Sequence, residues 1–371
     1  MASYAARRRR ALAAIGVAGA SIGFGAAWAA ESRDAAAQTA TTPTLPAATT
    51  PGTPVVAADP GELVISGVRG QAASTSLLRR AREGEIAGVI LMGRSISTKA
   101  QVAKLTGALQ RAAKAGGHPP LLIMVDQEGG TVRRLTSARP TRSARSLASL
   151  GVAGVRRQGL GSGKDLLGYG INVNLAPVAD VPTSAANFLG TRTFGTTASA
   201  VARNACAFAG GLAEAGVAPA LKHFPGLGGA GRTNTDDAPT TIRQSRAALE
   251  AGWAAYRECG GQGALTMISS AGYPALTGDA TPAVLSKATY DAARATGATG
   301  PFVTDAMEAG ALRNRSRAAP RAVDAGANLL LYTDESASAL GRRQLRAHLP
   351  RTVIDARAAP VRALRESLRA G

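Results

Sequence analysis

The sequence predicts an α/β fold of the (β/α)₈ TIM-type barrel, formed by a single domain in which parallel strands alternate with helices. Three observations support this prediction. Eight short apolar segments recur along the chain, and most are separated by longer Ala-, Leu- and Arg-rich stretches typical of helices. Several apolar segments end in a charged or imidazole side chain. In a barrel, the carboxyl ends of the strands form the active face.

Each predicted strand is rich in apolar residues, and several have no polar alternation, as expected for strands buried on both faces of a parallel sheet. In chain order the segments span residues 63–68, 88–92, 121–126, 173–180, 218–224, 264–269, 301–306 and 327–333. A doubly wound open sheet is the alternative. It is less favoured because no Gly-rich phosphate loop follows the first segment.

The N-terminal region has the composition of an export segment and a linker. Four consecutive arginines at positions 7–10 precede a run of small and apolar residues, so residues 1–30 are predicted to be a signal peptide or an N-terminal membrane anchor. The high Ala and Gly content favours cleavage. Residues 31–60 are rich in Thr, Pro and Ala and are expected to form a disordered linker. The barrel is assigned to residues 61–371, in an exported protein that is extracellular, associated with the cell wall or anchored outside the cytoplasm.

The chain is strongly basic, with 43 Lys and Arg against 24 Asp and Glu and a formal charge of +19. Nucleic-acid binding is one function that such a charge permits. Aromatic residues make up only 4% of the chain, and the arginines are spread along helix-like stretches without a nucleic-acid motif. We therefore expect no specific nucleic-acid partner. Anionic cell-wall polymers or acidic membrane headgroups suit the surface charge, and a monomer is the default expectation.

The cysteines and histidines indicate no metal centre. Cys206 and Cys259 are 53 residues apart in Ala-rich stretches, and the three histidines are scattered. None of these spacings matches a zinc cluster, so neither a metal nor a cofactor is expected. An oxidising location would permit a disulfide, but two small buried thiols are the favoured prediction.

Four strand ends carry candidate functional side chains. Asp126, Asp180, His223 and Asp305 each end or closely follow a predicted strand. Any one of them could instead form a helix cap or a loop hydrogen bond. Since barrel strand ends converge at one mouth, the set together predicts a site.

Carboxylates without a metal suit glycoside hydrolysis, in which one group attacks or stabilises the anomeric centre and another protonates the leaving oxygen. Hydrogen-bond donors for sugar hydroxyls would come from Arg134, Arg192, Lys222 and His223. Asp126 would accept hydrogen bonds from adjacent hydroxyls. An ion pair with a neighbouring arginine is the alternative for this carboxylate.

Six segments together resemble glycoside hydrolase family 3, in its single-domain β-N-acetylglucosaminidase or β-hexosaminidase-like branch. They are GVILMGRSI, LLIMVDQEGGTVRRL, INVNLAPVADV, RTFG, LKHFPG and VTDAMEAGAL, in this order, and they cover roughly residues 61–335. The resemblance implies that Asp305 is the nucleophile of a retaining mechanism. It also implies that Asp126, Arg134, Arg192, Lys222 and His223 hold the sugar. Glu308 is expected in the first turn of a helix rather than as a second catalyst.

The loop after LKHFPG departs from the family pattern, which reads K-H-F-P-G-H-G-D-T and then D-S-H, with the last Asp-His pair as general acid/base. Here Leu227 replaces the first loop histidine, and Asp236-Asp237-Ala238 stands where D-S-H is expected. Three interpretations remain open. Asp236 or Asp237 is itself the acid, with a raised pKa; or the substrate has a leaving group that needs little acid catalysis; or the barrel binds sugar without turnover.

The functional prediction is an exported retaining glycosidase that acts on a β-linked N-acetylglucosamine-containing glycan, such as a cell-wall fragment, with Asp305, Asp236 and Asp237 as catalytic candidates. One alternative is a glycosidase of other sugar specificity, such as a β-glucosidase or β-xylosidase. Another is a non-catalytic glycan-binding or cell-wall-associated protein.

Overall fold

A computed structural model describes residues 59–261, 264–312 and 315–368. All of them belong to the second of two units, Met1–Val55 and Val56–Gly371. The predicted export segment and all but the last two residues of the predicted linker lie outside the described residues. Asp59 and Pro60 belong to the fold, since Asp59 caps a short 3-10 helix and forms an ion pair with Arg342. In the described part of the chain, no helix is both long and apolar enough to cross a membrane.

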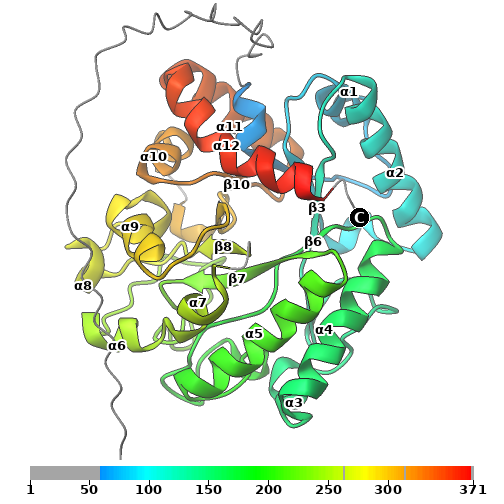
Figure 1. The fold of residues 1–371 in the computed structure, drawn as a ribbon. Coiled ribbons are helices and arrows are strands. Elements are labelled where there is room, and N and C mark those ends of the chain that lie inside the picture. Colours follow the sequence, from blue (N-terminus) through cyan, green and yellow to red (C-terminus); the bar gives the residue numbers. More distant parts are fainter. Residues whose placement is uncertain (1–58, 262–263, 313–314, 369–371) are drawn as a thin grey trace, which may run out of the picture. The chain divides into compact units, whose positions relative to one another are not determined.

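The described strands form a parallel barrel, which confirms the predicted fold class. Eight strands pair in the order β10-β1-β2-β3-β6-β7-β8-β9 among the described residues, and Figure 1 shows β6, β7 and β8 of this order. A parallel bridge between Val303 and Leu329 links β9 to the residue just before β10 and closes the circle. The strands are β1 (Val64–Gly67), β2 (Gly88–Leu91), β3 (Leu122–Val125), β6 (Val173–Asn174), β7 (Ala218–Phe224), β8 (Leu265–Ile268), β9 (Phe302–Thr304) and β10 (Leu330–Leu331).

Each of the eight predicted apolar segments contains one barrel strand, and every residue of these strands is buried. The fourth segment differs most from the prediction, because only Val173 and Asn174 form β6. Pro177 lies further along this segment and has no N–H to donate to a ladder. Val178 returns to the sheet only through an isolated bridge to Lys222.

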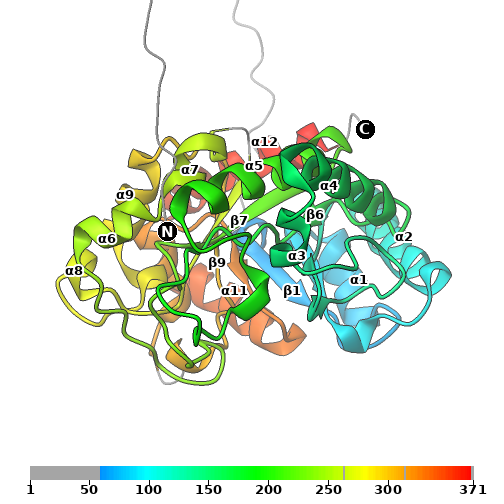
Figure 2. The same ribbon diagram turned by 90° about the horizontal axis from the view of Figure 1, so that it is seen from below.

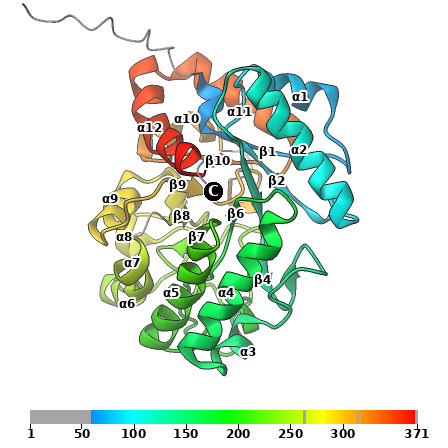
Figure 3. The ribbon, with the colours of Figure 1, turned by 45° about the vertical axis from the view of Figure 1, so that its right-hand side comes forward.

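Helices surround the strands (Figure 3). They are α1 (Thr75–Arg82), α2 (Lys99–Ala115), α3 (Ala144–Ala148), α4 (Gly151–Leu167), α5 (Ala198–Glu214), α6 (Arg246–Ala251), α7 (Ala254–Cys259), α8 (Pro274–Thr277), α9 (Lys287–Ala295), α10 (Ala318–Ala325), α11 (Glu335–His348) and α12 (Arg351–Ser367). Side chains of Ser74, Thr98, Thr197 and Asp334 cap four of the helix N-termini. Helices α4 and α5 lie side by side (Figure 2), and a Cβ at Gly159 would lie 2.3 Å from the Phe208 carbonyl oxygen.

Two buried apolar clusters make up the core. One fills the space between the strands and the helices. The other takes alternate strand positions such as Ile65, Met124 and Met267, and therefore occupies the barrel interior. Its members Ile90 and Leu331 also line the cavity at the carboxyl ends of the strands. The interior cluster thus forms part of the wall of the candidate site.

A small antiparallel hairpin follows β3 and was not predicted. It consists of β4 (Gln127–Gly129) and β5 (Val132–Arg133). The Gln127 side chain fixes it, because its amide nitrogen donates to the carbonyl of Leu135 and its oxygen accepts from the Leu135 N–H, each over 3.0 Å. The tight turn includes Gly130 with φ +60°, a conformation that favours glycine.

The favoured prediction of free thiols is wrong. Cys206 in α5 and Cys259 in α7 form a disulfide, with their Cα atoms 5.5 Å apart. The two helices lie against each other outside the barrel, so residues 53 positions apart in the chain become neighbours. Sequence spacing alone carries no information on this contact.

Candidate active site

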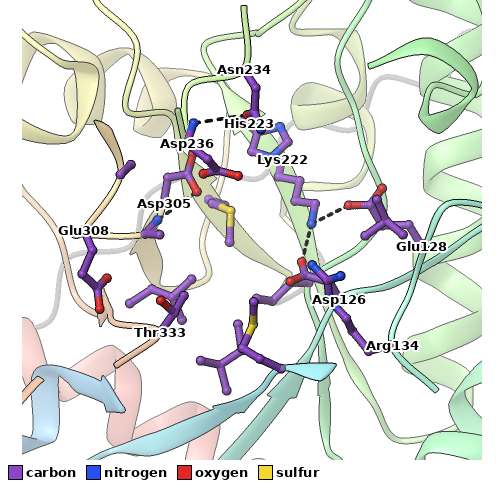
Figure 4. A pocket seen from close by; sticks show the side chains of 18 of the residues that line it. Asp126, Glu128, Arg134, Lys222, His223, Asn234, Asp236, Asp305, Glu308 and Thr333 are labelled. Carbon is purple, nitrogen blue, oxygen red and sulfur yellow. Dashed lines mark hydrogen bonds and ion pairs between the residues drawn. The ribbon is translucent and has the colours of Figure 1, made fainter. Parts of the chain in front are cut away.

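A cavity of about 460 Å³ opens at the carboxyl ends of the barrel strands. Seven of the nine predicted site residues line it, namely Asp126, Arg134, Arg192, Lys222, His223, Asp236 and Asp305. Asp237 does not line the cavity and is exposed. Figure 4 shows the arrangement, with Asp236, Asp305 and Glu308 on one side and Asp126, Glu128 and Arg134 on the other.

The barrel explains why these side chains meet. Asp126 directly follows β3, Lys222 and His223 lie near the end of β7, and Asp305 directly follows β9. Parallel strands of a barrel present their carboxyl ends at one mouth. A register shift between β7 and β8 at Lys222 and Phe224 interrupts the regular alternation, and both Lys222 and His223 reach the cavity.

A cluster of alternating charges forms one wall. The Lys222 ammonium group lies 2.7 Å from Asp126 Oδ1 and 2.8 Å from Glu128 Oε1. Arg192 donates two hydrogen bonds to Glu128, from Nε and Nη2, and each is 2.8 Å long. This bidentate geometry is typical of strong arginine–carboxylate pairs. The Lys222 and Glu128 side chains are each only 3% exposed. The cluster therefore holds two cations in place with little solvent screening around Lys222 and Glu128.

The charges shift the pKa values within this cluster. Burial by itself would raise the pKa of Glu128, but Lys222 and Arg192 outweigh burial and lower it to about 2. Burial opposes the charge of Lys222, yet Asp126 and Glu128 raise the pKa of its ammonium group above the usual value. Glu128 and Lys222 are therefore both ionised at neutral pH. Arg134 also lines the cavity, and among the described residues its buried Nε has no hydrogen-bond partner.

Glu128 was missed as a site residue. It lies two positions after the strand-end Asp126, in Asp-Gln-Glu-Gly-Gly, and the hairpin turns it toward Lys222 and Arg192. A second acid so close to a strand end is the signal that could have identified it. Glycine at both following positions permits the sharp turn, since Gly129 and Gly130 both have positive φ.

Asp180 contacts His223 on the side away from the cavity. Its Oδ2 lies 2.8 Å from His223 Nδ1, and its Oδ1 accepts from the N–H groups of His223 and Leu227 over 3.2 and 2.7 Å. Although it follows a strand segment like the other candidates, Asp180 is buried and does not line the cavity. Asp180 therefore engages Nδ1 of His223 and leaves Nε2 as the ring nitrogen available to a ligand.

Asp305 is partly buried at the end of β9. Its Oδ1 accepts from the Ala306 N–H over 2.8 Å, and its Oδ2 lies 3.5 Å from the Ser270 hydroxyl. Glu308 also lines the cavity, and the expectation of a helical position for it is wrong. Glu308 lies in a turn, where its Oε1 accepts from the Asp334 N–H over 3.0 Å.

The loop after β7 places Asp236, rather than Asp237, in the cavity wall. Asn234 lines the cavity as well, and its side-chain oxygen accepts from the Asp236 N–H over 3.2 Å. Although much of Asp236 is open to solvent, the protein atoms around its carboxyl group and then the charge of Asp305 raise its pKa. Ala238, the residue expected at the position of the family's histidine, does not line the cavity.

The arrangement offers two carboxyl groups in one cavity and a set of fixed donors. Asp236 favours its protonated form more than an ordinary aspartic acid does, while Asp305 accepts a hydrogen bond suited to a carboxylate. Within the described ranges, no group of three or more His, Cys, Asp or Glu side chains is arranged to hold a metal ion.

Sequence comparisons identify related proteins. The model of the glycosyl hydrolase family 3 N-terminal domain matches residues 59–364. Beta-hexosaminidase LpqI of Mycobacterium tuberculosis is 33% identical over 315 residues, which is 79% of this chain and 78% of that protein. An uncharacterized secreted glycosyl hydrolase of Arthroderma benhamiae is 32% identical over 295 residues, which is 76% of this chain and 83% of that protein.

Solved structures show the same barrel. A glycoside hydrolase family 3 beta-N-acetylglucosaminidase from Paenibacillus matches with a TM-score of 0.80 and 31% identity, over 84% of this chain and 62% of that longer chain. Beta-N-acetylhexosaminidase from Beutenbergia cavernae matches with a TM-score of 0.74 and 29% identity, over 83% of this chain and 97% of that one. The matched region includes the whole barrel, and the resemblance noted in the sequence is confirmed.

Proposed function

Because the chain belongs to glycosyl hydrolase family 3 and is a glycosidase that hydrolyses O-glycosyl bonds, we propose that it cleaves β-linked N-acetylglucosamine from glycans with retention of configuration. The observation that carries this proposal is the presence of Asp236 and Asp305 in one cavity with a donor-rich wall opposite. The names of the relatives, beta-hexosaminidase and beta-N-acetylglucosaminidase, support the choice of sugar.

Asp305 is the proposed nucleophile. Its carboxylate attacks the anomeric carbon while the bond to the leaving oxygen breaks, and a glycosyl ester forms on Asp305. Water then attacks the same carbon and releases the sugar, which restores the carboxylate. The N–H of Ala306 donates to Oδ1 of Asp305 and orients the carboxylate for attack.

Asp236 is the proposed general acid/base. It gives its proton to the departing glycosidic oxygen in the first step and takes a proton from the attacking water in the second. Its raised pKa suits the first task, and the pair of neighbouring carboxyl groups with different environments fits a retaining glycosidase. Asp236 would therefore supply the proton that the histidine supplies in the family, since Ala238 at the histidine position cannot transfer one. Asp237 lies outside the cavity wall that Asp236 lines, which favours Asp236 of the two candidates.

The charged wall opposite is the proposed sugar subsite. Lys222, Arg192 and Arg134 present N–H donors to the cavity, Asp126 presents carboxylate oxygens, and His223 presents Nε2. Adjacent sugar hydroxyls need donors and acceptors at fixed spacing, and preformed ion pairs supply both without reorganisation on binding. We also propose that the protein is exported, on the basis of residues 1–30, and that it meets cell-wall glycans there.

The test uses aryl β-N-acetylglucosaminide, aryl β-glucoside and aryl β-xyloside with the wild type, Asp305→Asn, Asp236→Asn and Asp237→Asn. We expect preferred turnover of the N-acetylglucosaminide, loss of turnover in Asp305→Asn, and a covalent adduct on Asp305 with a 5-fluoro-N-acetylglucosaminyl fluoride, found by intact mass. Preference for another glycoside would overturn the sugar assignment. Turnover that survives Asp305→Asn would overturn the mechanism.

A further inference from the structure

The loop that carries Asp236 is fastened to the chain segment that carries Asp305. The N–H of Gly310 donates to the carbonyl oxygen of Asp236 over 2.9 Å. On its other side, the Asp236 N–H donates to the Asn234 side chain. The N–H groups of Asp237 and Ala238 both donate to the Asn234 carbonyl, over 3.2 and 3.3 Å, so residues 234–238 form one compact turn.

Gly310 can make this contact because it has no side chain. A Cβ at this position would lie 2.5 Å from the carbonyl oxygen and 2.6 Å from the carbonyl carbon of Asp237. Both neighbours are backbone atoms, which cannot swing aside as the end of a flexible side chain could. The requirement for glycine here comes from close approach of two segments, not from a left-handed backbone conformation.

The segment from Asp305 to Gly310 is itself anchored to the barrel. The N–H of Asp305 donates to the Ile268 carbonyl in β8, and the N–H of Met307 donates to the Leu331 carbonyl in β10, each over 2.9 Å. The Ala309 N–H donates to the Ala306 carbonyl over 3.0 Å. One short anchored segment therefore carries Asp305 at one end and the contact to Asp236 at the other.

The rest of the loop is also attached to the surrounding protein. The Gly231 carbonyl accepts from the Phe188 N–H over 2.7 Å. Beyond the Asp236 turn, the Thr240 carbonyl accepts from the Gly272 N–H over 2.9 Å, and the Ile242 N–H donates to the Gly272 carbonyl over 2.8 Å. The loop that carries Asp236 is thus held against the rest of the protein by backbone hydrogen bonds.

We propose that Gly310 is a positioning residue that holds Asp236 at the separation from Asp305 that glycosyl transfer requires. This inference rests on the proposed function, in which Asp236 is the general acid/base. In retaining glycosidases the two catalytic carboxyl groups are typically about 5–5.5 Å apart, whereas a wider separation is typical of inverting enzymes. A displacement of about 1 Å in a catalytic group can cost roughly 10²-fold in rate.

The test compares Gly310→Ala with Gly70→Ala, a matched substitution at a glycine whose added Cβ meets nothing within 4 Å. Each variant is assayed on an N-acetylglucosaminide with an activated phenol leaving group and on one with an alkyl alcohol leaving group. We expect Gly310→Ala to lower kcat for the alkyl glycoside by at least about 10-fold, since its poor leaving group needs the acid. The rate of glycosyl–enzyme formation from the activated substrate, followed as the first-turnover burst of phenol, should fall much less. KM should change little, and added azide should rescue turnover of the activated substrate with formation of a glycosyl azide, since azide attacks without base assistance.

The outcomes distinguish failure of the proposed function from failure of the positioning by Gly310. A wild type that hydrolyses no glycoside overturns the proposed function. If the wild type is active but Gly310→Ala and Gly70→Ala have the same rates on both substrates, the positioning by Gly310 is overturned while the proposed function stands. An equal loss in the rate of glycosyl–enzyme formation from both substrates also overturns the positioning, because that pattern indicates general damage. If Gly310→Ala fails to fold, hydrogen exchange of the wild type decides: protection of the Gly310 amide supports the contact, and exchange at the rate of an open amide overturns it.

Discussion

Glu128 accepts two hydrogen bonds of 2.8 Å from Arg192 and a third of the same length from Lys222. Its side chain is only 3% exposed, so this carboxylate neutralises two cations in a region that water hardly reaches. Glu128 itself does not act on the substrate in the proposed mechanism. It determines where the proposed sugar-binding donors lie.

Replacing Glu128 with Gln should weaken both folding and sugar binding. The amide keeps the shape but loses the charge, which leaves Lys222 and Arg192 buried with less compensation, at a cost of about 3 kcal/mol in the free energy of unfolding. KM should rise more than kcat falls. Glu83→Gln, which removes an exposed helix pair with Arg79, is the matched control and should cost under about 1 kcal/mol. Equal effects in urea unfolding would contradict the importance of burial.

The same carboxylate should make stability depend on acid pH. Because the folded protein lowers the pKa of Glu128 from its ordinary 4.5 to about 2, the stabilisation is present above pH 4.5 and is lost as the pH falls toward 2. Its size corresponds to about 3 kcal/mol. Unfolding free energies of the wild type and Glu128→Gln should therefore differ most near neutral pH and converge toward pH 2. A difference that is constant over this range would show that the charge is not responsible.

Asp236 should set the alkaline limb of the pH–rate profile for substrates with poor leaving groups. The acid must be protonated in the first step, so kcat should fall as the pH rises through the raised pKa of Asp236. Asp236→Asn should abolish this limb and slow such substrates by about 10²–10⁴-fold. Asp237→Asn should keep the limb, because Asp237 lies outside the cavity wall. The reverse result would identify Asp237 as the acid.

Asp180→Asn should impair the reaction through His223. The amide can no longer accept as a carboxylate does, so the proton on Nδ1 and the orientation of the ring are no longer fixed. We expect kcat/KM to fall by about 10²-fold, a smaller effect than the loss of a triad aspartate in a protease. Circular dichroism and urea unfolding of the variant under the assay conditions distinguish this from simple unfolding, because a positioning effect lowers kcat/KM of a protein that is still folded. Unchanged kinetics would contradict a positioning function for Asp180.

Much of this protein is determined by local sequence. Continuous apolar segments, such as the one that becomes β3, fit only strands buried on both faces, and all eight predicted segments contain a barrel strand. Once the barrel is assigned, the position of Asp126, Lys222, His223 and Asp305 at one mouth follows from the common direction of the strands. Their proximity can be predicted without knowing the course of any loop.

Only the tertiary structure decided which residues that are distant in sequence become neighbours in space. Asp236 rather than Asp237 enters the cavity wall because the loop lies against Gly310, more than seventy residues away in the chain. Glu128 reaches Arg192 because a hairpin too short for a periodic pattern folds back beside β3, and Asp180 turns away from the cavity toward the backbone of Leu227. Strands follow from the burial of their own residues, whereas the course of a loop depends on contacts with segments that no local pattern identifies.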